Sequence, residues 1–204
     1  MIAIIDYGAG NVQSVYKALK YIGCDCKITR DKNEIINANG AILPGQGSFG
    51  DCMRSMIEYD IRDTVLDYIR SGKPFLGICV GLQLLFEGSE ESEGTEGIGV
   101  FRGKIKRIPN GEGLKIPHMG WNSLSFMNRE GIFRDIDDNP YVYFVHSYYL
   151  DSPDKSIVTA QTEYGVTIDA SVMKDNITAT QFHPEKSGDV GLKMLKNFAE
   201  MCEE

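Results

Sequence analysis

The chain has 204 residues and a formal net charge of −8 at pH 7, because 29 acidic residues outnumber 21 Lys and Arg. This acidic balance argues against a phosphate-binding surface, so we expect no nucleic-acid partner. Hydrophobic residues make up 42% of the chain, a share typical of folded proteins, and we expect a single domain over residues 1–204. The longest uncharged apolar run, Phe75–Phe86, is too short to cross a bilayer.

The number and spacing of the cysteines and the first residues of the chain bear on the cellular compartment that we expect for the protein. The 5 cysteines are odd in number and irregularly spaced, so they predict neither a disulfide framework nor a Cys-x-x-Cys zinc site, and we expect no metal. The chain starts with strand-like residues and lacks the positive leader of a secretory signal. We therefore expect a cytoplasmic protein without a membrane partner.

The first half of the chain alternates strand-like apolar runs with helical periodicity. The expected strands are Met1–Ile5, Lys27–Thr29, Gly40–Leu43 and Phe75–Ile78. The expected helices are Asn11–Ile22, Asn33–Ala38 with Asp31 as its N-cap, Tyr59–Arg70 and Leu82–Phe86. Strands that alternate with helices predict a parallel sheet with helices on both faces.

Strand-like segments dominate the second half. The expected strands are Lys104–Ile108, Trp121–Phe126, Tyr141–Tyr149, Ile157–Gln161, Val166–Ala170 and Ile177–Phe182. A final helix is expected after Ser187, which is a typical N-cap residue, and the glutamate-rich segment Glu87–Glu96 is interpreted as a solvated loop. The sequence thus predicts an α/β fold, a three-layer α/β/α sandwich whose mostly parallel central sheet is extended by antiparallel strands.

A candidate nucleophile, Cys79, lies between an expected strand and an expected helix. The segment Gly77-Ile-Cys-Val-Gly is the cysteine counterpart of the G-x-S-x-G nucleophile elbow. Flanking glycines tolerate the sharp turn that exposes such a nucleophile, and the start of the next helix favours a thiolate. A buried structural cysteine at the end of a strand explains this pentapeptide equally well when it is taken alone.

A thiolate nucleophile needs a base, and the chain has 3 histidines. His118 and His146 have no carboxylate within 3 residues, whereas His183 is followed by Pro184 and Glu185. Residues i and i+2 of an extended segment project to the same side, so Glu185 can orient His183 toward Cys79. A surface His–Glu pair is the alternative interpretation, and the presence of Cys79 favours a catalytic triad.

Acyl transfer also needs backbone donors for an oxyanion. The Val80 N–H follows the nucleophile directly, and Pro44–Gly47 is expected to reach the same edge of the sheet with a second donor, although a simple tight turn explains Pro44–Gly47 as well. Asp6–Asn11 resembles the opening of a dinucleotide fingerprint, but Gln13 occupies the third glycine position. We therefore expect a turn and a helix cap at Asp6–Asn11, and no cofactor.

Together these motifs resemble the class I glutamine amidotransferases, and more closely the glutaminase subunits of imidazole glycerol phosphate synthases. The resemblance covers nearly the whole chain. It is carried by Ile5-Asp-Tyr-Gly-Ala-Gly-Asn-Val, Pro44-Gly-Gln-Gly-Ser-Phe-Gly, Gly77-Ile-Cys-Val-Gly-Leu-Gln-Leu-Leu-Phe-Glu, Pro117-His-Met-Gly-Trp-Asn, Tyr143-Phe-Val-His-Ser-Tyr and Gln181-Phe-His-Pro-Glu-Lys-Ser. It implies a flavodoxin-like fold.

The resemblance also implies roles for individual residues. Cys79 is expected to attack the glutamine side chain, His183 to act as base and acid, and Glu185 to orient His183. The residues expected to hold glutamine or its oxyanion are Gly45, Gln46, Gly47, Val80, Gln83, Ser147 and Tyr148. Most relatives carry Val at the position of Gln46, where a backbone N–H is the expected donor.

The resemblance further implies a heterodimer with a (β/α)₈ cyclase, which receives ammonia from glutamine through a tunnel. Positions expected at or near this interface are Asn11, Trp121, Tyr143 and Lys186. Without the resemblance, Trp121 and Tyr143 are interpreted as core aromatics and Lys186 as a solvated charge. Two alternatives stay open: a paralogous glutaminase that supplies ammonia for sugar amidination, and a non-catalytic, redox-sensitive α/β binding module.

Overall fold

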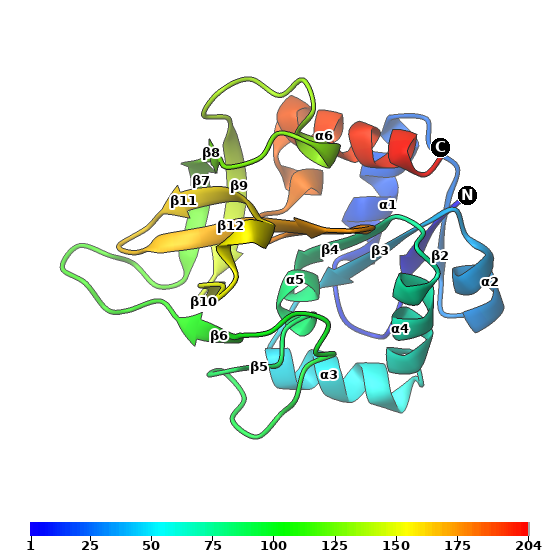
Figure 1. Cartoon of the computed structure of the whole chain (residues 1–204), viewed down its shortest axis with the longest axis horizontal. Helices are drawn as coiled ribbons and strands as arrows, with labels where there is room; N and C mark the ends of the chain where they lie inside the picture. The colour runs from blue at the N-terminus through cyan, green and yellow to red at the C-terminus, as the bar shows by residue number, and fades with distance from the viewer. Residues whose placement is uncertain (204) are drawn as a thin grey trace.

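A central eight-stranded sheet organises residues 1–203, which are the residues that this computed structural model describes (Figure 1). Its strand order is β2-β1-β3-β4-β13-β12-β11-β8. The strands are β1 (Ile2–Ile5), β2 (Cys26–Thr29), β3 (Gly40–Gly45), β4 (Phe75–Cys79), β8 (Ser125–Phe126), β11 (Val158–Glu163), β12 (Thr167–Lys174) and β13 (Ile177–Thr180).

The sheet combines a parallel part with an antiparallel extension. β2, β1, β3, β4 and β13 pair in parallel, and β13, β12, β11 and β8 pair in an antiparallel manner. The four strands β1, β3, β4 and β13 are buried at every position, as expected when helices cover both faces of a parallel sheet. The predicted sheet is confirmed.

Helices form the two outer layers. They are α1 (Val12–Tyr21), α2 (Lys32–Asn37), α3 (Phe49–Glu58), α4 (Arg62–Arg70), α5 (Val80–Leu84) and α6 (Gly188–Met201). Figure 1 shows α1 and α6 on one side of the sheet and α3, α4 and α5 on the other, which is the predicted three-layer arrangement. Within residues 1–203, no helix is both long enough and apolar enough to span a membrane.

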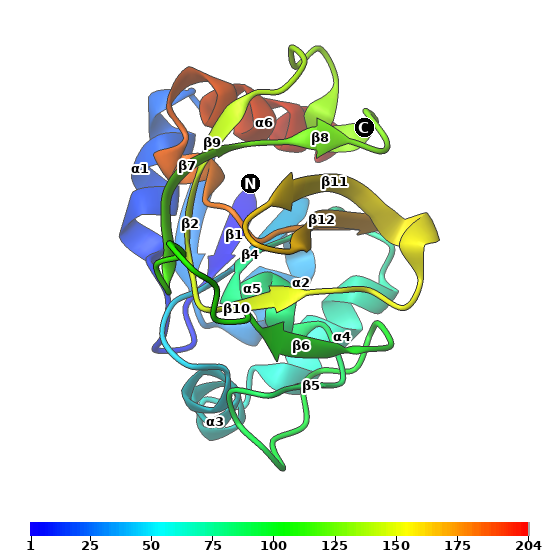
Figure 2. The ribbon, with the colours of Figure 1, turned by 90° about the vertical axis from the view of Figure 1, so that its left-hand side faces the viewer.

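Two small sheets flank the antiparallel end of the central sheet (Figure 2). One contains β10 (Tyr148–Leu150), β6 (Lys104–Arg107) and β5 (Gly88–Ser89). The other pairs β7 (His118–Ser123) with β9 (Tyr141–His146) in an antiparallel manner. The strand predicted over Tyr141–Tyr149 therefore breaks at Ser147, and its two parts belong to different sheets.

Several local predictions were wrong. The strand predicted over Trp121–Phe126 is divided between β7 and β8, which belong to different sheets. Helix α3 was not predicted, although its buried residues have helical spacing, and the helix predicted from Tyr59 begins at Arg62 because Tyr59 ends α3. Strand β5 lies in the segment Glu87–Glu96, which was interpreted as a loop. Ser187 does precede α6, but its hydroxyl donates to the His183 carbonyl at 2.6 Å and does not cap the helix.

Candidate active site

Cys79 occupies a strained turn between β4 and α5. Its φ is +56°, in a region that residues with a side chain rarely adopt. The turn requires very close packing, because a Cβ added to Gly81 would lie 2.0 Å from the Leu43 carbonyl oxygen. A Cβ on Gly45 would similarly lie 2.6 Å from the Val80 Cβ. Residues on β3, β4 and α5 thus fix the position of the sulfur.

His183 and Glu185 form a buried pair beside this turn. Nδ1 of His183 lies 2.8 Å from Oε1 of Glu185, and the side chains are only 4% and 1% exposed. Burial lowers the pKa of His183, but the opposing effect of Cys79 and Glu185 is larger and raises this pKa to about 10. Among residues 1–203, Nε2 of His183 has no hydrogen-bond partner, so it is free to exchange a proton with a substrate.

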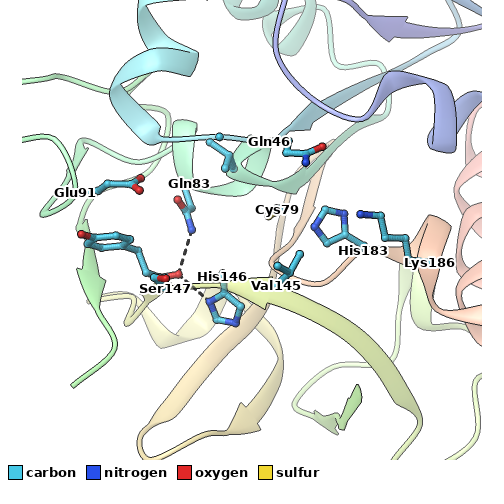
Figure 3. Close-up of a pocket in the computed structure, with 12 residues that line it drawn as sticks. Gln46, Cys79, Gln83, Glu91, Val145, His146, Ser147, His183 and Lys186 are labelled. Carbon is cyan, nitrogen blue, oxygen red and sulfur yellow. Dashed lines mark hydrogen bonds between the residues drawn. The ribbon is translucent and has the colours of Figure 1, made fainter. Parts of the chain in front are cut away.

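A cavity of about 190 Å³ opens beside the nucleophile. Figure 3 shows Cys79 near the middle of this pocket, with His183 and Lys186 at one end and Gln83 and Glu91 at the other. The lining residues are Gln46, Gly47, Cys79, Val80, Gln83, Glu91, Val145, His146, Ser147, Tyr148, His183 and Lys186. The structure therefore brings almost all of the predicted site residues around one cavity; Gly45 lies directly behind it, paired with Cys79 across β3 and β4.

The segment Gln46–Gly47 follows β3 and is exposed. The Gln46 carbonyl accepts a hydrogen bond from the Cys52 thiol at 3.5 Å, and Gly47 has a φ of +109°. The C=O and N–H groups of one trans peptide point in opposite directions, so the Gly47 N–H points away from Cys52. This segment is held more loosely than the buried start of α5 at Val80.

A hydrogen-bonded chain of side chains borders the cavity. Gln83 Nε2 donates to the Tyr148 carbonyl at 3.2 Å, and His146 Nδ1 lies 2.8 Å from the same carbonyl (Figure 3). Gln83 Nε2 also donates to Gln181 Oε1 at 3.0 Å. Gln181 Nε2 in turn lies 3.7 Å from the Cys79 sulfur. Gln181 had no predicted role, although it lies two residues before His183.

Glu91 is a second residue that the sequence did not indicate. Its carboxylate accepts a hydrogen bond from the Phe49 N–H at 2.8 Å, which anchors it at the start of α3, and the side chain lines the cavity. The solvated-loop interpretation is therefore wrong at Glu91. No local pattern reveals this contact, because its two partners are 42 residues apart in the chain.

His118 and His146 form a separate buried pair, with Nδ1 of His118 3.0 Å from Nε2 of His146. Burial lowers their pKa values to about 4 and about 3, so both rings are neutral at pH 7. Neither histidine has a carboxylate partner among the hydrogen bonds of residues 1–203. Their geometry favours a structural role over that of the base.

The predicted interface residues lie on the surface beside the site. Trp121 is 55% exposed and meets the edge of Tyr143, so the core interpretation of Trp121 is wrong. The Lys186 ammonium lies 5.9 Å from the centre of the Tyr143 ring. Asn11 caps α1 by accepting from the Ser14 N–H at 3.4 Å, which confirms the predicted cap.

No group of three or more His, Cys, Asp or Glu side chains in residues 1–203 is arranged to hold a metal ion. The cavity instead combines an elbow thiol, a buried imidazole with a free nitrogen, and nearby backbone N–H groups. This set of groups suits acyl transfer through a covalent thioester.

The chain belongs to the family described as glutamine amidotransferase class-I, which matches residues 3–202. Two relatives are named imidazole glycerol phosphate synthase subunit HisH. The protein of Caldanaerobacter subterraneus subsp. tengcongensis is 52% identical over 98% of both chains, and that of Geobacter metallireducens is 48% identical over 97% of both. The predicted family is confirmed.

Solved structures support the same fold at lower identity. A structure described as a glutamine amidotransferase has a TM-score of 0.78 at 20% identity, and all of both chains is covered. The structure of PurLQS from Thermotoga maritima has a TM-score of 0.75 at 22% identity, covering 98% of this chain and 97% of that one. Both structures share the overall fold of this chain.

Proposed function

We propose that this chain is the glutaminase subunit of an imidazole glycerol phosphate synthase and supplies ammonia for histidine biosynthesis. The observation that carries the proposal is the elbow thiol of Cys79 in one cavity with the buried His183–Glu185 pair. Identity of 48–52% to proteins named HisH favours this pathway over the sugar-amidination alternative. The buried His–Glu pair argues against a non-catalytic redox module.

The proposed reaction begins with attack of the Cys79 sulfur on the carbonyl carbon of the glutamine side-chain amide. A C–S bond forms, and the carbonyl electrons move to the oxygen. His183, protonated because its pKa is raised to about 10, gives its Nε2 proton to the amide nitrogen. The C–N bond then breaks, and ammonia leaves a glutamyl thioester on Cys79.

Hydrolysis of the thioester completes the cycle. His183 accepts a proton from the attacking water, a new C–O bond forms, and the C–S bond breaks to release glutamate and the Cys79 thiolate. The pair is then restored as imidazolium and thiolate. We assign Glu185 to holding the ring of His183 in one orientation and stabilising its positive charge.

Substrate binding is proposed for the other groups around the cavity. Val80 and Gln46 are assigned to the oxyanion through backbone N–H groups, and Gly45 and Gly47 to the space beside it. Gln83, Ser147 and Tyr148 are assigned to the glutamine backbone and side chain. We add Glu91, because its carboxylate reaches the cavity and suits the ammonium group of an amino acid.

A partner cyclase with a (β/α)₈ barrel is proposed for the exposed face beside the site. Trp121, Tyr143 and Lys186 gather there, and Met119 on β7 is 62% exposed. Ammonia loses its nucleophilic lone pair when water protonates it, so direct transfer to a partner preserves its reactivity. We place the complex in the cytoplasm, where the free thiols of the chain stay reduced.

The test is to express the chain together with the cyclase subunit of an imidazole glycerol phosphate synthase and to measure complex formation and glutamate production. We expect a one-to-one complex that produces glutamate when the nucleotide substrate of the cyclase is bound. Trp121→Ala should weaken binding by ~2 kcal/mol, as exposed aromatic anchors do, while the control Tyr21→Ala, which is 80% exposed on α1, should not. A complex that produces no glutamate would refute the proposed function.

A further inference from the structure

Gln181 lies directly beside the nucleophile and has no part in the mechanism above. Its side chain is completely buried, and its Nε2 lies 3.7 Å from the Cys79 sulfur. We propose that Gln181 is a further catalytic residue, whose side-chain N–H donates a hydrogen bond to the Cys79 sulfur and stabilises the thiolate. This inference deepens the proposed function and rests on it.

The fold places Gln181 there by strand register. β13 pairs in parallel with β4, and the last aligned residues are Thr180 and Ile78. The next residues are Gln181, which directly follows β13, and Cys79, which is the last residue of β4. The backbone N–H of Gln181 donates to the Ala170 carbonyl at 2.8 Å, so β12 holds the segment from its other side.

Two residues that follow the end of β13, Gln181 and His183, reach the Cys79 side of the sheet edge. Gln181 Nε2 lies 3.7 Å from the Cys79 sulfur and His183 lines the same cavity as Cys79, whereas Phe182 between them is buried in the hydrophobic core. One segment therefore delivers a proton-exchanging group and a neutral donor to Cys79. The two groups have different chemistry, because an amide N–H stabilises a negative sulfur without transferring a proton to it.

The orientation of the Gln181 amide follows from its neighbours. Gln83 Nε2 donates to Gln181 Oε1 at 3.0 Å, so the oxygen of Gln181 faces Gln83 and the NH₂ group faces Cys79. Gln83 is itself held by the Tyr148 carbonyl, which also receives the Nδ1–H of His146. Each N–H donor in this series of hydrogen bonds has a defined acceptor, and the last donor, the Gln181 NH₂ group, points at the Cys79 sulfur.

This hydrogen bond has its effect when the sulfur carries negative charge. The charge is present before attack on glutamine and returns when the thioester is cleaved, but it is absent in the thioester. A donor to the thiolate therefore favours both the start and the end of the reaction cycle. Gln181 does not line the cavity, so its loss should affect turnover more than glutamine binding.

The experiment compares Gln181→Met, which keeps the length of the side chain and removes its donor, with the wild type and with Gln161→Met. Gln161 is a suitable control because its amide donates to Asp169 on the same sheet and does not line the cavity. Iodoacetamide is added across a pH series, and alkylation of Cys79 is followed by peptide mass spectrometry. This readout separates Cys79 from the other four cysteines.

In Gln181→Met we expect the pH midpoint of Cys79 alkylation to rise by about one unit, which corresponds to a tenfold loss of thiolate stabilisation. We expect kcat for glutamine to fall about tenfold with KM unchanged, and Gln161→Met to behave as the wild type. An unchanged midpoint in folded Gln181→Met would overturn the proposal. A wild type that is alkylated with the expected profile but hydrolyses no glutamine would refute the proposed function alone.

If Gln181→Met does not fold, nitrogen-15 NMR of the wild type tests the proposed hydrogen bond between Gln181 and Cys79. The side-chain amide signals of Gln181 should shift with the pH midpoint of Cys79 alkylation, and this shift should be absent in Cys79→Ala. Amide signals that ignore the ionisation of Cys79 would overturn the proposal.

Discussion

Replacing Glu185 with Gln tests the member of the proposed triad that acts on the substrate only through His183. The carboxylate lies 2.8 Å from Nδ1 of His183, and both side chains are almost inaccessible to water, so solvent does not screen their interaction. Glutamine has the same shape and still offers an oxygen to His183, but it lacks the charge. A hydrogen bond to a charged group contributes ~1.5–3 kcal/mol and a neutral one ~0.5–1.5 kcal/mol, a difference of roughly 1–1.5 kcal/mol.

We therefore expect Glu185→Gln to lower kcat about tenfold and to leave KM unchanged. The assay is glutamate release by the complex with the cyclase. The control is Glu163→Gln, because Glu163 is an exposed carboxylate at the end of β11. Wild-type turnover in Glu185→Gln, or a loss as complete as in Cys79→Ala, would refute the role assigned to Glu185.

The same variant changes the pH dependence of stability. The pKa of His183 is raised from 6.5 to about 10 in the folded chain, so its positive charge stabilises the fold. This stabilisation is complete below pH 6.5 and is lost as the pH rises through about 10. Without the Glu185 charge the folded pKa is lower, so the free energy of unfolding should fall less over this interval in the variant. Urea denaturation at pH 6 and pH 10 measures the difference, and equal falls would contradict the assigned pairing.

Three further outcomes follow from other contacts. Cys79→Ala should abolish glutamine hydrolysis and leave folding and cyclase binding intact, because the side chain lies at a strained turn; residual activity measured by glutamate release would contradict this. Gly81→Ala should lower the free energy of unfolding in urea by ~1–3 kcal/mol or more, because the new Cβ meets the Leu43 carbonyl; wild-type stability would show that the turn can relax. Stability should also fall as the pH drops below 6.5, because His118 and His146 have pKa values of about 4 and about 3 in the folded chain, and a variant without His118 should show a smaller fall between pH 7 and pH 5.

The sequence predicted the catalytic edge of the sheet because the signals there are local. The elbow around Cys79 follows a buried strand, and His183 and Glu185 are only two residues apart, although Glu185 lies in a short 3-10 helix (Pro184–Lys186) and not in the extended segment that the sequence predicted. Parallel strands end at one edge, so β3, β4 and the end of β13 bring Gln46, Cys79 and His183 together. Such features depend on spacing within a few residues, which a single sequence displays.

Other parts of the site depend on contacts between distant segments. Glu91 is anchored by the start of α3, and Gln181 is oriented by Gln83, 98 residues away in the chain. Helix α3 was missed although its buried residues recur at helical spacing, because Pro44–Gly47 before it was interpreted as an oxyanion donor or a tight turn and no helix was assigned to the residues that follow. Ser187 has the residue type of an N-cap, but its hydroxyl binds the chain near His183 instead. In each case tertiary packing decides how a polar side chain is used.

The two backbone donors proposed for the oxyanion differ in how firmly the fold holds them. Val80 is buried at the start of α5, whereas Gln46 is exposed and its carbonyl accepts a single bond from the Cys52 thiol. A thiol is a weak donor, and a neutral hydrogen bond contributes only ~1 kcal/mol to stability. Coupling between two binding sites typically amounts to ~1–3 kcal/mol, which is enough to reorient the backbone at Gln46 and Gly47, and with it the Gln46 N–H, without moving the nucleophile. We therefore expect a bound partner to control turnover through this segment, while Cys79, His183 and Glu185 keep the same geometry.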